Sequence, residues 1–164
     1  MFPQDIEASA TAVIQAALKA DVMVATAESC TGGLVSGALT AVAGSSAALD
    51  RGFVTYSNEA KGEMLGVSED LLARFGAVSE PVARAMASGA VERSRASAAV
   101  SITGVAGPGG GSEEKPVGLV HFAAAGPSGA VVHVERRFGD IGREAVRLES
   151  VRVALALLLE AVST

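Results

Sequence analysis

A serine and a cysteine stand side by side where a buried strand is expected to end. They belong to the segment 26–33, Thr-Ala-Glu-Ser-Cys-Thr-Gly-Gly, which leads from an apolar run into a glycine-rich helix start. Backbone N–H groups at a helix N-terminus have no partner within the helix, so they can bind an anion or a developing oxyanion. These donors would be the N–H groups of Cys30, Thr31, Gly32 and Gly33. The alternative is that Ser29 or Thr31 only caps the helix.

Ser29 and Cys30 are both candidate nucleophiles, and a serine needs a base. A cysteine at a helix start can be reactive, but a small buried apolar role is favoured for Cys30. The histidines, His121 and His133, fall in two late strands and are expected to be ordinary strand residues. Lys61 closely follows a strand end, and a partly desolvated lysine can act as a base near neutral pH. Spacing alone favours the alternative, in which Lys61 is a solvated helix residue.

A long glycine-rich loop offers a seat for a phosphate. The segment 103–111 follows a buried strand, and its backbone N–H groups could cradle an anion, although it matches neither a P-loop nor a dinucleotide fingerprint. Arg143 and Arg147 stand one helical turn apart and could clamp an anion between them. The alternatives are a flexible surface loop and a surface pair of arginines. No group of side chains has metal-ligand spacing, so no metal or cofactor is expected.

Composition limits the class of protein. The chain has 164 residues, 49% of them hydrophobic, and a formal net charge of −5, which predicts a single domain over residues 1–164 that binds neither nucleic acid nor an anionic membrane. Cys30 is the only cysteine, so no internal disulfide can form. There is no signal-peptide pattern and no apolar run long enough for a membrane span, so a cytoplasmic protein is expected. A mean hydropathy of +0.40 hints at a buried interface in a homo-oligomer.

The elements that must position these residues can be read from hydrophobic periodicity and turn signals. Helices are predicted over residues 3–20, 34–42, 58–65, 68–76, 80–94 and 143–162, and strands over 22–27, 53–56, 97–103, 119–125 and 130–138. Residues 126–129, Gly-Pro-Ser-Gly, indicate a hairpin. The order predicts a layered α/β domain with a mixed, mostly parallel sheet, a late β-hairpin and helices packed on the sheet.

Four ordered motifs resemble the family of the C-terminal domain of the competence/damage-inducible protein CinA. They are residues 27–33, 56–61 with 65–67, 76–80, and 103–111 with 115–118. The stand-alone form of this family is nicotinamide-nucleotide amidohydrolase. The resemblance therefore implies hydrolysis of the carboxamide of nicotinamide mononucleotide (NMN), a small-molecule substrate, to nicotinate mononucleotide and ammonia in pyridine-nucleotide recycling.

The resemblance also implies roles for individual residues. Ser29 matches the nucleophile and Lys61 the base of a serine amidase without metal, with Tyr56 beside them. The substrate-binding set is Cys30, Thr31, Gly32, Gly33, Gly44, Asn58, Thr103, Gly104 and Arg143. The segment 139–143 before the last helix, Gly-Asp-Ile-Gly-Arg, is two residues longer than the family's usual Gly-Asp-Arg. The alternative function is a non-catalytic nucleotide-binding or oligomerisation module.

Overall fold

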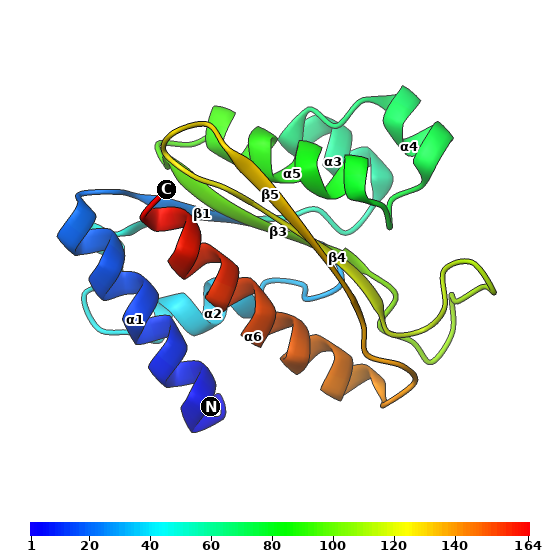
Figure 1. The fold of residues 1–164 in the computed structure, drawn as a ribbon, viewed down its shortest axis with the longest axis horizontal. Coiled ribbons are helices and arrows are strands. Elements are labelled where there is room, and N and C mark those ends of the chain that lie inside the picture. The colour runs from blue at the N-terminus through cyan, green and yellow to red at the C-terminus, as the bar shows by residue number, and fades with distance from the viewer.

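Five strands form one mixed sheet with helices on both faces (Figure 1). The computed structural model describes residues 1–164. The helices are α1 Gln4–Ala20, α2 Leu34–Thr40, the short 3-10 helix η1 Ser45–Ala47, α3 Asn58–Leu65, α4 Glu69–Phe75, α5 Glu80–Glu92 and α6 Arg143–Val162. The strands are β1 Val24–Glu28, β2 Leu49–Val54, β3 Ala98–Gly104, β4 Leu119–Ala125 and β5 Val131–Arg137. The predicted α/β fold is confirmed.

The strand order is β2-β1-β3-β4-β5. β1 pairs in parallel with both β2 and β3, whereas β4 runs antiparallel to β3 and β5 antiparallel to β4. The last pair is the predicted hairpin. Because β1, β2 and β3 are parallel, their carboxyl ends lie along one edge of the sheet, which is where ligands bind in α/β folds.

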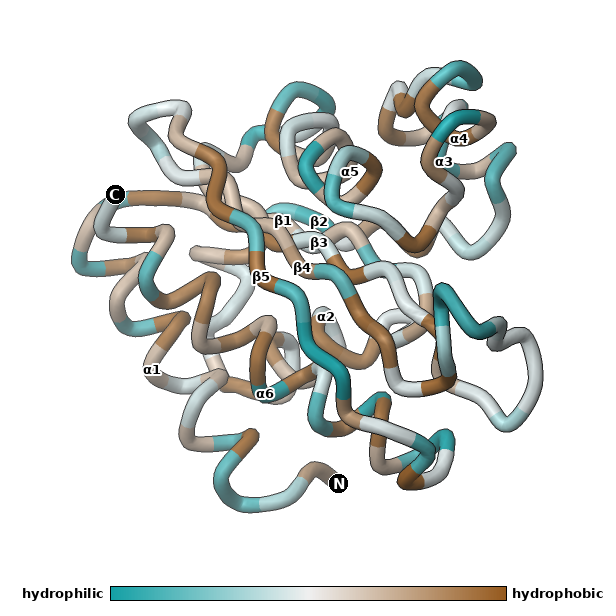
Figure 2. The backbone as a smooth tube through the Cα atoms, turned by 45° about the vertical axis from the view of Figure 1, so that its right-hand side comes forward, coloured by the Kyte–Doolittle hydropathy of each residue, from teal (hydrophilic) through white to brown (hydrophobic).

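The helices form two layers with separate apolar cores. α1, α2 and α6 cover one face of the sheet over the larger cluster, which includes Phe122 and Leu155. α3, α4 and α5 lie on the other face, where Met86 and Leu65 belong to the second cluster. β4 is buried throughout, but β5 is an edge strand, and Figure 2 shows how its later half turns hydrophilic. No helix is long and apolar enough to cross a bilayer.

Serine caps mark the starts of two of the predicted helices. The hydroxyls of Ser57 and Ser68 accept hydrogen bonds from the N–H groups of Ala60 and Leu71, which begins α3 and α4. β2 begins at Leu49, earlier than the predicted start at residue 53. β2 is an edge strand, and the residues after Leu49 are the polar pair Asp50 and Arg51 and then Gly52, so the apolar pattern that marks buried strands is missing there.

Candidate active site

Three segments meet at the carboxyl ends of the parallel strands. Ser29 follows β1, Tyr56 follows β2 closely, and Thr103 lies at the end of β3. They surround a cavity of about 300 Å³. Its lining residues are Ser29, Cys30, Tyr56, Asn58, Lys61, Ala77, Val78, Thr103, Gly104, Val105, Ala106, Gly107, Gly109, Gly110 and Arg143. The structure thus brings most of the predicted site residues together.

Lys61 contacts Ser29 in the floor of this cavity. Its side chain enters from the first turns of α3 and is only 1% exposed, so it is not a solvated helix residue. Nζ lies 3.0 Å from Ser29 Oγ, 2.8 Å from the carbonyl oxygen of Thr55 and 3.5 Å from that of Tyr56. No carboxylate lies within ion-pair distance of Lys61. Burial therefore lowers the pKa of Lys61 below its ordinary value.

These contacts accommodate both protonation states of the amine. Nζ donates to three acceptors, Ser29 Oγ and the carbonyl oxygens of Thr55 and Tyr56, which matches the three N–H groups of an ammonium. After loss of one proton the amine can still donate to both carbonyls, and its lone pair can then accept the Ser29 hydroxyl proton. In the neutral state, the Lys61 amine lies within reach of the Ser29 hydroxyl proton, which is the geometry that a general base needs.

Cys30 lies next to Ser29 but has a different environment. It is 5% exposed, and burial raises the pKa of its thiol to about 12. A thiol in this state is protonated at neutral pH and is a poor nucleophile. Cys30 therefore has the environment of a small buried residue, which is the role that the sequence favoured for it.

The start of α2 differs from the prediction of free helix donors. The buried carboxylate of Glu28 accepts hydrogen bonds from the N–H groups of Val35 and Ser36, each at 2.9 Å, and from the Thr31 hydroxyl at 2.7 Å. Glu28 therefore caps α2, and neither Ser29 nor Thr31 does. A helix N-terminus stabilises negative charge, and this carboxylate already occupies the position that an anionic ligand would need. The N–H groups of Cys30 and Thr31, ahead of the helix, donate to no other residue.

Four residues of the predicted binding set do not line the cavity. The Thr31 side chain is turned to Glu28, and the Gly32 N–H donates to the Ser29 carbonyl oxygen at 3.0 Å. Gly32 and Gly33 have φ angles of +58° and +103°, so their role is to let the chain turn into α2. Gly44 directly precedes η1. It lies near the amino ends of β1 and β2, where the Val24 N–H donates to the carbonyl oxygen of Ala48.

The far wall of the cavity comes from β3, the loop after it and the start of α6. Thr103 donates its hydroxyl proton to the carbonyl oxygen of Ala77 at 2.8 Å. Gly104 has no room for a side chain, because a Cβ would lie 2.8 Å from the carbonyl oxygen of Leu119. Arg143 Nη1 donates to the Gly107 carbonyl oxygen at 2.7 Å and Nη2 to the Tyr56 hydroxyl at 3.2 Å. The longer segment 139–143 therefore still brings Arg143 to the cavity.

Sequence reasoning assigned no role to Ala77 and Val78, although both line the cavity. The signals that could have found them are their place in the motif 76–80 and their position before the N-cap of α5. Arg147 does not form an anion clamp with Arg143. Its guanidinium donates instead to the carbonyl oxygens of Cys30 and Thr31, at 3.1 and 3.3 Å.

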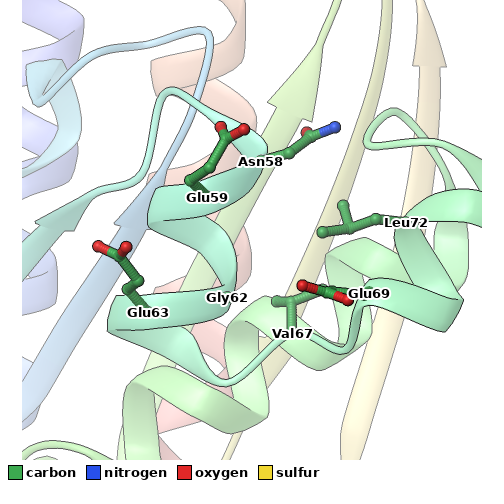
Figure 3. Close-up of a pocket in the computed structure, with 7 residues that line it drawn as sticks. All are labelled: Asn58, Glu59, Gly62, Glu63, Val67, Glu69 and Leu72. Carbon is green, nitrogen blue, oxygen red and sulfur yellow. The ribbon is translucent and has the colours of Figure 1, made fainter.

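A larger hollow of about 600 Å³ lies beside this cavity, between α3 and α4 (Figure 3). Three carboxylates line it, those of Glu59, Glu63 and Glu69, and it shares only Asn58 with the cavity that holds Ser29. It contains neither Ser29 nor Lys61. In the whole structure, no group of three or more His, Cys, Asp or Glu side chains is arranged to hold a metal ion.

Fold and site together define a mixed α/β domain with a buried serine–lysine pair at the carboxyl ends of its parallel strands. The chain belongs to the CinA C-terminal domain family, whose model matches residues 6–162.

Named relatives cover most of the chain. It is 55% identical to nicotinamide-nucleotide amidohydrolase PncC of Enterobacter agglomerans over 89% of each chain. It is 57% identical to PncC of Escherichia coli strain K12, over 82% of this chain and 81% of that one. The crystal structure of competence/damage inducible protein CihA from Agrobacterium tumefaciens matches with a TM-score of 0.96 and 58% identity, over 98% of each chain.

Proposed function

We propose that this chain, as one amidohydrolase domain, hydrolyses the carboxamide of NMN to nicotinate mononucleotide and ammonia. The observation that carries the proposal is the 3.0 Å contact between Lys61 Nζ and Ser29 Oγ inside the cavity. The names of the PncC relatives support the choice of substrate. No cofactor is needed for this reaction.

The proposed chemistry passes through an acyl-enzyme. Neutral Lys61 takes the hydroxyl proton of Ser29, and Oγ attacks the carboxamide carbon. The tetrahedral intermediate collapses when the Lys61 ammonium gives its proton to the leaving nitrogen, which departs as ammonia. A water molecule then attacks the ester carbon as the same amine takes its proton. The Lys61 ammonium returns that proton to Ser29 Oγ as the ester bond breaks, and the acid product loses its own proton to solvent as nicotinate mononucleotide. The N–H group of Cys30 donates to no other residue, and Cys30 lines the cavity, so this N–H is the available donor for the oxyanion.

The phosphate of the substrate is assigned to the wall opposite Ser29. The α2 N-terminus is already capped by Glu28, so the remaining positive group at the cavity is Arg143, beside the backbone of residues 104–110. A guanidinium next to exposed backbone N–H groups is suited to a phosphate. Tyr56 and Asn58 complete the rim between the two ends of the substrate.

The decisive experiment is an ammonia-release assay with the purified chain and NMN, nicotinamide, nicotinamide riboside and NAD. We expect ammonia from NMN and much less from the other three. Ligand-dependent thermal stabilisation by NMN without ammonia release would support the non-catalytic nucleotide-binding module instead. Residence in the cytoplasm and assembly into a homo-oligomer remain predictions from the sequence.

A further inference from the structure

Two arginines one turn apart on α6 have different surroundings. Arg143 lines the cavity and contacts Tyr56 and Gly107. Arg147 does not line it, and no carboxylate pairs with it. Its guanidinium packs over Gly32, where a Cβ would lie 3.4 Å from Nη2, and donates to two carbonyl oxygens of the turn that follows Ser29.

These two hydrogen bonds fix the direction of the peptide groups in the turn. In a trans peptide the C=O and the following N–H point in opposite directions. Holding the Thr31 carbonyl therefore fixes the Gly32 N–H, which donates to the carbonyl oxygen of Ser29 at 3.0 Å. Holding the Cys30 carbonyl fixes the Thr31 N–H, one of the two free donors beside the nucleophile. Both bonds from Arg147 are charge-assisted, and such bonds are stronger than neutral ones.

The same turn is held on its other side by Glu28. That carboxylate accepts from the Thr31 hydroxyl and from the first N–H groups of α2. Glu28 and Arg147 form no ion pair with each other, so each charge is directed at the main chain or hydroxyl of the turn. The segment Ser29–Gly33 thus lies between the buried Glu28 carboxylate and the Arg147 guanidinium. Neither residue lines the cavity.

We propose that Arg147 is a positioning residue, which holds the turn so that Ser29 Oγ stays within reach of Lys61. This inference rests on the proposed amidase function. It assigns different effects to the two arginines of α6. Arg143 contacts the substrate and affects its binding, whereas Arg147 acts through the main chain of the turn and affects the rate of the bound complex. Misplacing a reacting group by about 1 Å can cost about 100-fold in rate.

The test compares Arg147→Met, Arg147→Lys and Arg152→Met in the NMN assay. Methionine keeps an apolar stem but donates nothing. Arg152 is the matched control, since it lies on the same helix and bonds to Asp5 and Glu149, away from Ser29. We expect Arg147→Met to lower kcat by about 10- to 100-fold with KM within about threefold of wild type. Arg147→Lys should recover part of kcat because an ammonium can still donate to a carbonyl, and Arg152→Met should match wild type.

Amide hydrogen exchange of the same variants supplies a second readout that does not depend on the substrate. The Gly32 amide should exchange at least about tenfold faster in Arg147→Met than in wild type or Arg152→Met, because local opening becomes easier. Unchanged Gly32 protection, or a raised KM with wild-type kcat, would overturn the positioning role. Absence of ammonia release by the wild-type protein would instead refute the proposed function, and the exchange result would still decide the role of Arg147.

Discussion

Replacing Lys61 tests whether its amine is the base for Ser29. Lys61→Met keeps a linear side chain in the buried site and removes the nitrogen, whereas Lys61→Arg keeps a cation that cannot deprotonate at working pH. If Lys61 only supplied positive charge, arginine would preserve much of the activity. If it must accept a proton, both variants should be inactive.

The magnitude follows from the surroundings of Nζ. At the ordinary lysine pKa of 10.5, about 0.03% of the amine would be neutral at pH 7, and each unit by which burial lowers the pKa raises that fraction about tenfold. Nζ is buried with no carboxylate partner, and two carbonyls accept its protons. A positioned general base contributes about 10²- to 10⁴-fold, so we expect kcat to fall by at least that factor in both variants.

The assay is ammonia release from NMN across about pH 6 to about pH 9, where a neutral base becomes more abundant as pH rises. Because the active form of Lys61 is the neutral amine, the wild-type rate should rise with pH, with a midpoint below the ordinary lysine pKa of 10.5. Thermal unfolding of each variant checks that the fold survives. Substantial turnover by Lys61→Arg, or the same rising limb in Lys61→Met, would refute the reasoning, and Tyr56 would be the next candidate base.

Three further predictions concern the nucleophile, the phosphate and the histidine pair. Ser29→Ala should lose several orders of magnitude in kcat while Cys30→Ala stays active; the reverse result in the same assay would name the thiol as nucleophile. Nicotinamide riboside, which lacks the phosphate, should have a kcat/KM about 10- to 100-fold below that of NMN, and Arg143→Met should reduce this difference; equal efficiency for both substrates would remove Arg143 as a phosphate ligand. His121 Nδ1 lies 2.8 Å from His133 Nε2, and desolvation, chiefly, lowers the pKa of both below 6.5, so folding stability should be full above about pH 6.5 and fall as pH drops towards the folded pKa values. Urea unfolding of the double glutamine variant should lack that fall, and an unchanged pH dependence would contradict it.

Much of the fold could be predicted because local signals agree with the final packing. α3, β4 and α6 have the predicted bounds, since a serine cap, a continuous buried run and a long apolar periodicity mark them. The edge strand β2 was predicted too short, because its polar residues Asp50 and Arg51 are adjacent and do not alternate with apolar ones. Such an edge is recognised only once its partner β1 is known.

The gathering of Ser29, Lys61 and Thr103 could also be expected, because each follows or ends a strand that the topology makes parallel. The state of Lys61 could not. Its position four residues into a polar helix start is equally typical of a solvated lysine, and only the tertiary structure shows that it is buried against Ser29.

Two side chains hold the turn that follows Ser29, those of Glu28 and Arg147, and sequence patterns do not identify either of them. Their contacts determine how the site has to be tested. Glu28 ends a buried strand and could have been expected to need several hydrogen-bond donors, since a buried carboxylate without partners is very costly. Its donors are the first N–H groups of α2, so the helix N-terminus stabilises the protein's own anion. For this reason the proposed phosphate site is at Arg143, which lines the cavity. Arg147 is more than 100 residues from the carbonyls it holds, and no local pattern distinguishes it from Arg143. Substitutions at the two arginines therefore separate substrate binding from placement of the nucleophile.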